Sequence, residues 1–263
     1  MISDLHLHTT ASDGKLSPTE LVRWAKDSGL EVIAVTDHDT VDGIDEAEEE
    51  AIKLGILFVR GIEISAYAVS EIHILGYNID HKNAEFLSAL ENVKQMRIAR
   101  NVAIGAKLAS LGIKLNMDFE GKGVGRMNIA REMVSEGVCH DVNEAFDKYL
   151  SVGAKAYCSV RRVTPIEAVK LIEGCGGFAS IAHPKKYLLD GRLEMLISGL
   201  RPLGLRGLEV YYPGHSDKDI SQLLGFCKRY GLLPTGGSDY HGDEDKNFKC
   251  QLDARTAKAL HLF

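Results

Sequence analysis

The chain has 263 residues, of which 45% are hydrophobic and 26% are charged, and its formal net charge is −6 at pH 7. A chain of this length can bury one substantial core, so we expect one main domain. No apolar run approaches the roughly 18 residues that would span a bilayer. The acidic balance excludes a broad coating of nucleic acid, which needs many Lys and Arg residues, but it allows a small anionic ligand that is held locally.

The N-terminal residues enter a strand-like segment directly, without the basic and apolar regions of a signal peptide, so we expect a cytoplasmic protein. The five cysteines are widely spaced, odd in number and never in a C-x-x-C pattern. This spacing indicates neither a disulfide framework nor a thiolate zinc site. We therefore expect buried thiols.

Strands and helices alternate over the first part of the chain. The expected elements are a strand at 2–8, a helix at 18–28, a strand at 31–36, a helix at 43–54 and a strand at 56–64. This βαβαβ order predicts a parallel sheet wrapped by helices. Ser17-Pro18-Thr19-Glu20 and Thr164-Pro165-Ile166-Glu167 each combine an N-cap, a proline at the first helical position and a glutamate at the third, which marks two helix starts.

A strand at 71–77 is followed by a stretch, 83–157, that reads as helices with glycine-bearing turns. The alternation then resumes with a helix at 164–174, strands at 177–182 and 206–211, a helix at 216–229 and a strand at 232–237. The sequence therefore predicts an α/β barrel formed by residues 1–82 and 158–263, with a helical insertion at 83–157 that caps one end.

His6 and His8 form a His-x-His pair on the first predicted strand. Because side chains alternate along a strand, both imidazoles project from one face while Leu5 and Leu7 face the other. Two imidazoles on one face can chelate a metal ion. For this motif alone, two hydrogen-bonded histidines at the end of a strand are an equally good interpretation.

Further polar residues stand where predicted strands end, at the edge where α/β barrels carry their active sites. They are Asp13, His38 with its neighbours Asp37 and Asp39, Glu63, His73, His183, Asp239 and His241. Taken singly, each reads more readily as a core histidine or a turn-capping carboxylate. So many polar residues at successive strand ends are not a coincidence, and they indicate one shared site. His215 also follows a predicted strand. His81, His140 and His261 are expected at the surface.

The candidate ligands are nitrogen and oxygen donors, which suit manganese, zinc or iron. Nine ligands exceed the needs of one ion, and the number fits two or three. Two or three divalent ions carry more positive charge than three carboxylates neutralise, so the site needs an anion. A phosphate ester fits best, because metal ions can bind its oxygens and stabilise the attacking and leaving groups.

The segments DLHLHTTASDG, TDHD, GIEIS, EIHILGY, AHP and GSDYH, in this order, resemble the PHP (polymerase and histidinol phosphatase) family of metal-dependent phosphoesterases. The resemblance covers essentially the whole chain and implies a distorted seven-stranded β/α barrel of TIM type. It implies one metal on His6, His8, Glu63 and Asp239, a second on Asp13, His38 and His241, and a third on Glu63, His73 and His183. Glu63 would bridge two ions, and Asp37 and Asp39 would orient neighbouring groups.

The helical insertion resembles a branch of this family that contains nucleoside 3′,5′-bisphosphate phosphatases and 5′-to-3′ RNA exonucleases. Lys94, Arg97 and Arg100 form a cationic stripe on one predicted helix, although a solvated helix face would have the same pattern. Arg126 follows a glycine-bearing turn, and Asn128 stands where the family usually has a histidine. The implied substrate contacts are Arg97, Arg100, Arg126, Asn128, Lys155 and Lys185.

These residues predict hydrolysis of a small phosphorylated substrate, such as a nucleoside bisphosphate or the 5′ end of a short RNA, by in-line attack of a metal-bridging hydroxide. His38 and Glu63 would act within the metal site, and the leaving group would take its proton from a metal-bound water or from His215. Three alternatives remain open: a histidinol-phosphate phosphatase, an amidohydrolase, and a non-catalytic accessory module of a polymerase.

Overall fold

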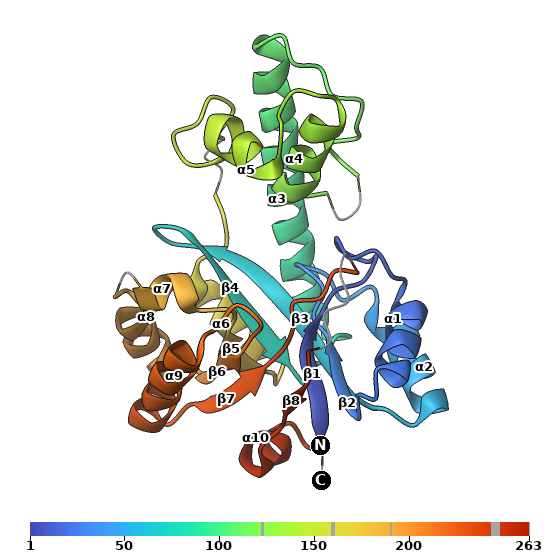
Figure 1. Ribbon diagram of the computed structural model, residues 1–263, viewed down its shortest axis with the longest axis vertical. Helices are drawn as coiled ribbons and strands as arrows, with labels where there is room; N and C mark the ends of the chain where they lie inside the picture. The colour runs from blue at the N-terminus through green and yellow to red at the C-terminus, as the bar shows by residue number, and fades with distance from the viewer. Residues whose placement is uncertain (122–123, 159–160, 190, 243–247, 263) are drawn as a thin grey trace. The chain divides into compact units, whose positions relative to one another are not determined.

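The computed structural model describes residues 1–262 apart from 122–123, 159–160, 190 and 243–247. The chain divides into two compact units, one formed by Met1–Ala89 and Val163–Phe263 and the other by Leu90–Arg162. Figure 1 shows the strands in the first unit and only helices among the labelled elements of the second. The domain bounds expected from the sequence, a barrel of 1–82 and 158–263 and an insertion of 83–157, stay a prediction.

All seven expected strands are present in the first unit, each within three residues of its expected bounds. They are β1 (Ile2–Leu7), β2 (Val32–Val35), β3 (Leu57–Tyr67), β4 (Glu71–Tyr77), β5 (Phe178–Ile181), β6 (Leu205–Tyr211) and β7 (Leu233–Gly236). An eighth strand, β8 (Cys250–Gln251), pairs antiparallel with β1 and gives the order β7-β6-β5-β4-β3-β2-β1-β8. A two-residue strand has no periodicity, so the sequence did not indicate it.

The segment that follows β7 brings the two ends of the sheet together. The Asp239 N–H donates to the His6 carbonyl at 2.9 Å, and the His8 N–H donates to the Tyr240 carbonyl at 3.0 Å. These bonds join the chain after β7 to β1, which is the last strand but one at the other end of the strand order. The predicted distorted α/β barrel is therefore confirmed as a nearly closed one, with eight strands instead of seven.

Strand β4 runs antiparallel to both β3 and β5, which corrects the expectation of a purely parallel sheet. Only residues 68–70 separate β3 from β4, and a parallel crossover needs a dozen residues or more, so the two strands form a hairpin. His73 consequently lies near the start of its strand, not at the end as expected. The reversed direction still places it beside Ser65, just past Glu63 on β3.

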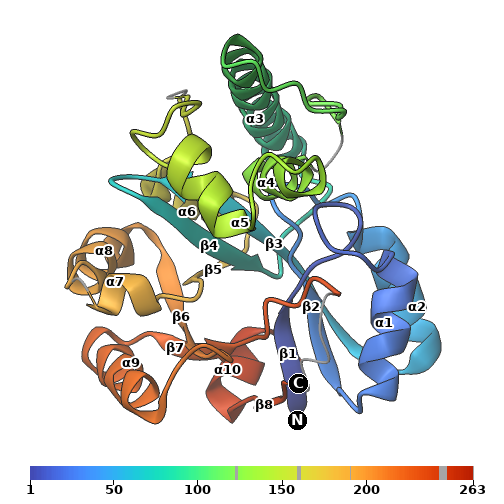
Figure 2. The same cartoon turned by 45° about the horizontal axis from the view of Figure 1, so that its top comes forward.

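Helices cover the outside of the barrel strands (Figure 2). They are α1 (Pro18–Asp27), α2 (Ile44–Leu54), α6 (Pro165–Gly174), α7 (Lys185–Leu189), α8 (Leu193–Leu200), α9 (Asp217–Tyr230), α10 (Ala254–Ala259) and the 3₁₀ turn Arg201–Leu203. The capping boxes predicted at Ser17 with Glu20 and at Thr164 with Glu167 are both formed. They satisfy backbone N–H groups that have no partner inside the helix.

The second unit consists of helices packed around their own apolar cluster. The elements are most of α3 (Ala84–Ser110), then α4 (Arg126–Ser135), α5 (Val142–Ala145) and the π-helical turn Phe146–Leu150. Their cluster includes Ile104, Leu108 and Met133, all nearly inaccessible to solvent. Where the structure describes this unit, it contains no strand, as expected for 83–157.

Two apolar clusters hold the first unit together. One lies along β1 to β5 and reaches α10, and the other packs α1 and α2 against β1 and β2. The five cysteines are buried and unbridged, as predicted. Among the helices of the described residues, none combines the length and apolarity that crossing a bilayer requires.

We expect Leu21→Ala to lower the free energy of unfolding by about 2–5 kcal/mol, because it opens a cavity between α1 and the sheet. Leu21 is completely buried in the cluster between the helices and the strands. Urea unfolding of the metal-free protein measures the change. The matched control is Ile52→Ala on α2, where the side chain is 74% exposed. Equal losses in the two variants would contradict this description of the core.

Candidate metal centre

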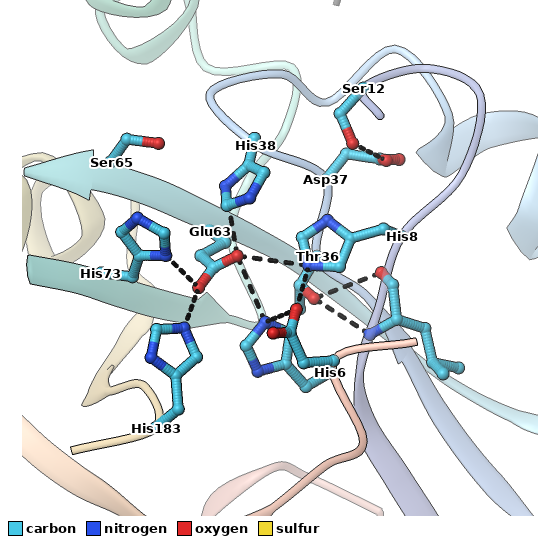
Figure 3. A network of polar contacts seen from close by, with 12 residues as sticks. His6, His8, Ser12, Thr36, Asp37, His38, Glu63, Ser65, His73 and His183 are labelled. Carbon is cyan, nitrogen blue, oxygen red and sulfur yellow. Dashed lines mark hydrogen bonds and ion pairs between the residues drawn. The ribbon is translucent and has the colours of Figure 1, made fainter. Parts of the chain in front are cut away.

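Glu63 of β3 is completely buried, and histidine rings approach both of its carboxylate oxygens (Figure 3). Oε1 lies 2.9 Å from His73 Nδ1 and 3.1 Å from His183 Nε2. Oε2 lies 3.2 Å from the Nε2 atoms of His6 and His8 and 3.1 Å from His38 Nδ1. One carboxylate therefore joins two sets of potential metal ligands.

The first set comprises His6, His8, Glu63 and Asp239. The Nε2 atoms of His6 and His8 each lie 3.2 Å from Glu63 Oε2. They lie 3.4 Å and 3.2 Å, respectively, from Asp239 Oδ1. A tetrahedral ion with bonds of about 2.0–2.2 Å would hold its ligand atoms about 3.3–3.6 Å apart. The set predicted from the sequence therefore has the spacing of a metal site.

Two further sets adjoin the first. His8, Asp13, His38 and His241 form one of them, in which Asp13 Oδ1 lies 3.3 Å from His241 Nε2. His38, Glu63 and His73 form the other. The sequence predicted a third group of Glu63, His73 and His183, so the observed and the predicted groups share Glu63 and His73. His183 contacts the same Glu63 oxygen as His73. The assignment of each ligand to an ion stays a prediction.

Several ligand atoms of these groups are buried and have no hydrogen-bond partner among the described residues. They are His6 Nε2, both ring nitrogens of His8, Asp13 Oδ1, His38 Nδ1 and Glu63 Oε2. Burying polar atoms without partners is costly, and such atoms are rare in native proteins. Nitrogen and oxygen donors that converge on one another in this way fit divalent ions, and they include no thiolate.

The carboxylates and histidines of the site shift one another's pKa values. Burial alone raises the pKa of Glu63 and Asp239, but neighbouring histidines outweigh burial and hold both pKa values well below the usual range. Burial lowers the pKa of His8, yet contacts with Asp239 and Glu63 raise it to about 10. Burial dominates at His38 and lowers its pKa to about 4. His38 is therefore neutral at pH 7, as a metal ligand must be.

Asp37 and Asp39 hold the loops around the ligands, in agreement with the role expected for them. Asp37 accepts hydrogen bonds from the Thr9 N–H at 2.8 Å, the Thr9 hydroxyl at 2.7 Å and the Ser12 hydroxyl at 2.5 Å. These bonds fix the loop that carries Asp13. Asp39 accepts the Ser65 N–H at 2.8 Å, two residues after Glu63.

Two buried carboxylates beside the site escaped the sequence analysis. Asp4 and Glu209 are both completely buried, and each contacts His6. Glu209 stands between Leu208 and Val210, as Glu63 stands between Ile62 and Ile64, so a carboxylate within an apolar strand is the signal that could have found it. The expectation of a surface position for His81 was wrong, because this residue is only 7% exposed and contacts Asp45.

His215 is buried, and its Nδ1–H donates to the Val210 carbonyl at 2.8 Å. Burial lowers its pKa, so the ring is neutral at pH 7 and its Nε2 lacks a proton. Lys185 Nζ donates to the Gly214 carbonyl at 2.6 Å and lies 3.3 Å from Asp219 Oδ2. Lys185 therefore ties down the loop that carries His215.

In the second unit, three of the residues expected to contact substrate gather at the start of α4. A Cβ atom at Gly125 would lie 3.1 Å from Arg97 Nη1, so the guanidinium packs against this N-cap. Asn128 Oδ1 accepts the Gly125 N–H at 2.9 Å, and Arg126 is the first residue of the helix. A helix N-terminus with arginines beside it attracts anions.

The other two candidates of this unit have different surroundings. Arg100 is only 8% exposed. Lys155 places its ammonium 5.7 Å from the centre of the Tyr149 ring.

The chain is similar to several known proteins. A family model described as the PHP domain matches residues 4–114. A 5′-3′ exoribonuclease of Haemophilus influenzae is 38% identical over 90% of this chain and 89% of its own length. A 3′,5′-nucleoside bisphosphate phosphatase of Chromobacterium violaceum is 34% identical over 90% of this chain and 86% of its own length.

Among solved structures, an amidohydrolase from Chromobacterium violaceum with bound sulfate and no metal superposes with a TM-score of 0.86. It is 32% identical, and the superposition covers 99% of this chain and 96% of the other. The similarity therefore extends through both compact units. The chain belongs to the PHP domain family of metal-dependent phosphoesterases.

Proposed function

We propose that this chain removes the 3′-phosphate from nucleoside 3′,5′-bisphosphates or cleaves nucleotides from the 5′ end of short RNA, using two or three divalent ions such as Mn²⁺. Both substrates carry a phosphate group in addition to the ester that is hydrolysed. The names of the exoribonuclease and bisphosphate phosphatase relatives support this substrate class. They favour it over histidinol phosphate, which has a single phosphate, and over the C–N bonds that amidohydrolases cleave.

The observation that carries the proposal is the position of Glu63 between two sets of histidines. Its Oε2 faces His6 and His8, and its Oε1 faces His73 and His183. A carboxylate in this position suits the bridging of two ions, which is the arrangement that phosphoester hydrolysis by metal pairs uses. A site for a single ion would use the histidines at only one of the two Glu63 oxygens.

Divalent ions held by these residues would polarise the phosphate oxygens and supply a hydroxide near neutral pH. The chain's own residues orient the components of the site. Asp37 fixes the loop of Asp13, and Asp39 fixes the backbone after Glu63. His215 has an unprotonated Nε2, so it is suited to accept a hydrogen bond and not to donate a proton to the leaving alcohol.

The second phosphate of the substrate would bind at the start of α4 in the helical unit. Arg97 and Arg126 supply positive charge there, and the backbone N–H groups of the first turn add to it. The Asn128 side chain is engaged with the Gly125 N–H, so it stabilises the helix start and adds no charge. We therefore assign recognition of the second phosphate mainly to the two arginines.

In the presence of Mn²⁺, the best substrate should be either 3′-phosphoadenosine 5′-phosphate, which releases phosphate, or a 5′-phosphorylated RNA oligomer, which releases nucleotides. Histidinol phosphate should be a poor substrate. The reason is that only the first two offer a second phosphate to the arginines. Steady-state kinetics on the three substrates measure the ratio of kcat/KM. A clear preference for histidinol phosphate would contradict the proposal.

A matched pair of variants tests the arginine site within the same experiment. Arg97→Ala should raise KM for the bisphosphate and leave kcat for a simple aryl phosphate unchanged. Lys114→Ala removes an exposed charge from the same unit and should change neither value. Equal effects of the two variants would exclude a specific phosphate contact of Arg97.

Glu63→Gln should abolish metal loading and turnover together. A neutral amide binds divalent ions far more weakly than a carboxylate, and it cannot bridge two of them. We expect kcat/KM to fall by at least about 100-fold and the number of Mn²⁺ ions per chain, measured by elemental analysis after desalting, to fall as well. The control is Glu48→Gln, which alters a surface ion pair with Arg60. Full activity of Glu63→Gln would exclude the bridging role.

Binding of Mn²⁺ should release protons, and the affinity for Mn²⁺ should rise with pH. Contacts with acidic groups outweigh burial and raise the pKa of His8 to about 10, so in the metal-free protein at pH 7 this ring is a cation with a proton on each nitrogen; the pKa of His6 is raised by the same kind of contact. An ion must displace the proton from the nitrogen that it binds. Titration calorimetry at about pH 6, 7 and 8, in buffers with different ionisation enthalpies, measures the release. An enthalpy that is independent of the buffer would contradict it.

A further inference from the structure

Glu209 lies on β6 and is completely buried, yet nothing in the sequence motifs gives it a role. Its two oxygens have different partners. Oε1 lies 3.0 Å from His6 Nδ1, and Oε2 accepts the backbone N–H of His183 at 2.6 Å. A buried carboxylate is costly unless specific hydrogen bonds compensate for the loss of water. Both compensating contacts of Glu209 go to residues of the candidate metal centre.

The contact with His6 determines which ring nitrogen can bind a metal. An ionised carboxylate only accepts hydrogen bonds, so the hydrogen between the two residues belongs to His6 Nδ1. His6 Nε2 is then the ring nitrogen left for a metal ion, which would displace any proton that this atom carries. This atom lies 3.2 Å from Glu63 Oε2 and 3.4 Å from Asp239 Oδ1, on the side of the first ligand set.

The contact with His183 fixes a strained backbone. His183 has a φ of 25°, a left-handed value that residues other than glycine rarely adopt. Such a conformation persists only where the surrounding structure holds it, and the hydrogen bond from its N–H to Glu209 does so. In this conformation His183 Nε2 reaches Glu63 Oε1 at 3.1 Å. Glu209 therefore acts on ligands on both sides of Glu63.

Asp4 offers a close comparison, because it is also completely buried and also contacts His6. Its Oδ1, however, accepts the backbone N–H groups of His6 at 3.2 Å and Ser238 at 2.9 Å. Asp4 thus shapes the backbone and does not touch the imidazole ring through these bonds. Of the two buried carboxylates, Glu209 alone has a hydrogen bond to the ring of His6.

We propose that Glu209 is a positioning residue of the metal centre, which keeps the proton of His6 on Nδ1 and holds His183 in place so that both rings present Nε2 to the ions. The proposal rests on the proposed function, since it assumes that the site binds divalent metal. Carboxylates that orient ligating histidines in this way strengthen metal binding in other sites.

Glu209→Gln tests the proposal with almost no change in shape. If the amide oxygen accepts the His183 N–H, the amide NH₂ faces His6 Nδ1 and forces the ring proton onto Nε2, where it blocks the metal. If the amide is reversed, the NH₂ faces the His183 N–H and releases that backbone. Either way, we expect the Mn²⁺ affinity measured by titration calorimetry to fall by about 10- to 100-fold.

Thermal unfolding separates positioning from general stabilisation. Wild type should gain stability when Mn²⁺ is added, whereas Glu209→Gln should gain much less while its metal-free Tm stays close to that of wild type. Asp4→Asn, the matched control, should keep an Mn²⁺ affinity close to that of wild type. Equal Mn²⁺ affinity for wild type and Glu209→Gln would overturn the proposal. If wild type itself binds no Mn²⁺, the proposed function fails and this proposal fails with it.

A measurement on the unaltered protein decides the matter even if Glu209→Gln does not fold. In the Zn²⁺-loaded protein with ¹⁵N-labelled histidines, two-bond NMR correlations should show His6 with its hydrogen on Nδ1 and its metal on Nε2. Coordination of zinc through Nδ1 of His6 would leave no hydrogen for Glu209, and this result would overturn the proposal.

Discussion

The architecture of the site depends on one buried carboxylate, Glu63, surrounded by imidazoles. Its five histidine contacts come from β1 and the residue that follows it, the loop after β2, β4 and the segment after β5. Without a positive charge nearby, a carboxylate with no exposure to solvent would be strongly destabilising. The imidazoles supply that charge in the metal-free protein, and divalent ions would supply it in the loaded one. The barrel strands therefore converge on a buried carboxylate that needs positive charge beside it, from protonated imidazoles or from metal ions.

The strand ends around Glu63 adopt backbone conformations that ordinary sequences avoid. Asp39, His183 and Asp239 all have positive φ values, and none of them is a glycine. Each such residue costs about 1–3 kcal/mol and persists where neighbouring contacts determine it. The Asp239 N–H is held by the His6 carbonyl, and the Asp39 N–H by the Glu63 carbonyl. The bond from Asp239, which joins the chain after β7 to β1, thus also fixes the backbone of a candidate ligand.

The two compact units divide the proposed chemistry between them. The first contains every candidate metal ligand, and the second contains the arginines at the start of α4. Metal-assisted hydrolysis requires a rigid set of ligands, and the candidates lie on the barrel strands or in the segments that follow them. Recognition of a second phosphate requires charge and backbone N–H groups, which a helix start provides.

The sequence by itself determined the local features of this protein. The period of two along β1 predicted that His6 and His8 would face the same way, and the capping boxes predicted where α1 and α6 begin. Most of the candidate ligands were found as polar residues at strand ends, since an α/β barrel gathers such ends at one edge. The inferences about β1 and the two helix starts succeed because they depend on residues close together in the chain.

Only the tertiary structure decided which distant residues meet. The short loop after β3 favours an antiparallel β4, but only the register of the pair shows that His73 lies beside Ser65, close to Glu63. The partners of Glu209 are His6, 203 residues earlier, and His183, 26 residues earlier. A single carboxylate in an apolar strand looks the same in a sequence whether it bridges metals, orients a ligand or supports a backbone. Its role depends on which atoms face it, and long-range strand pairing fixes those atoms.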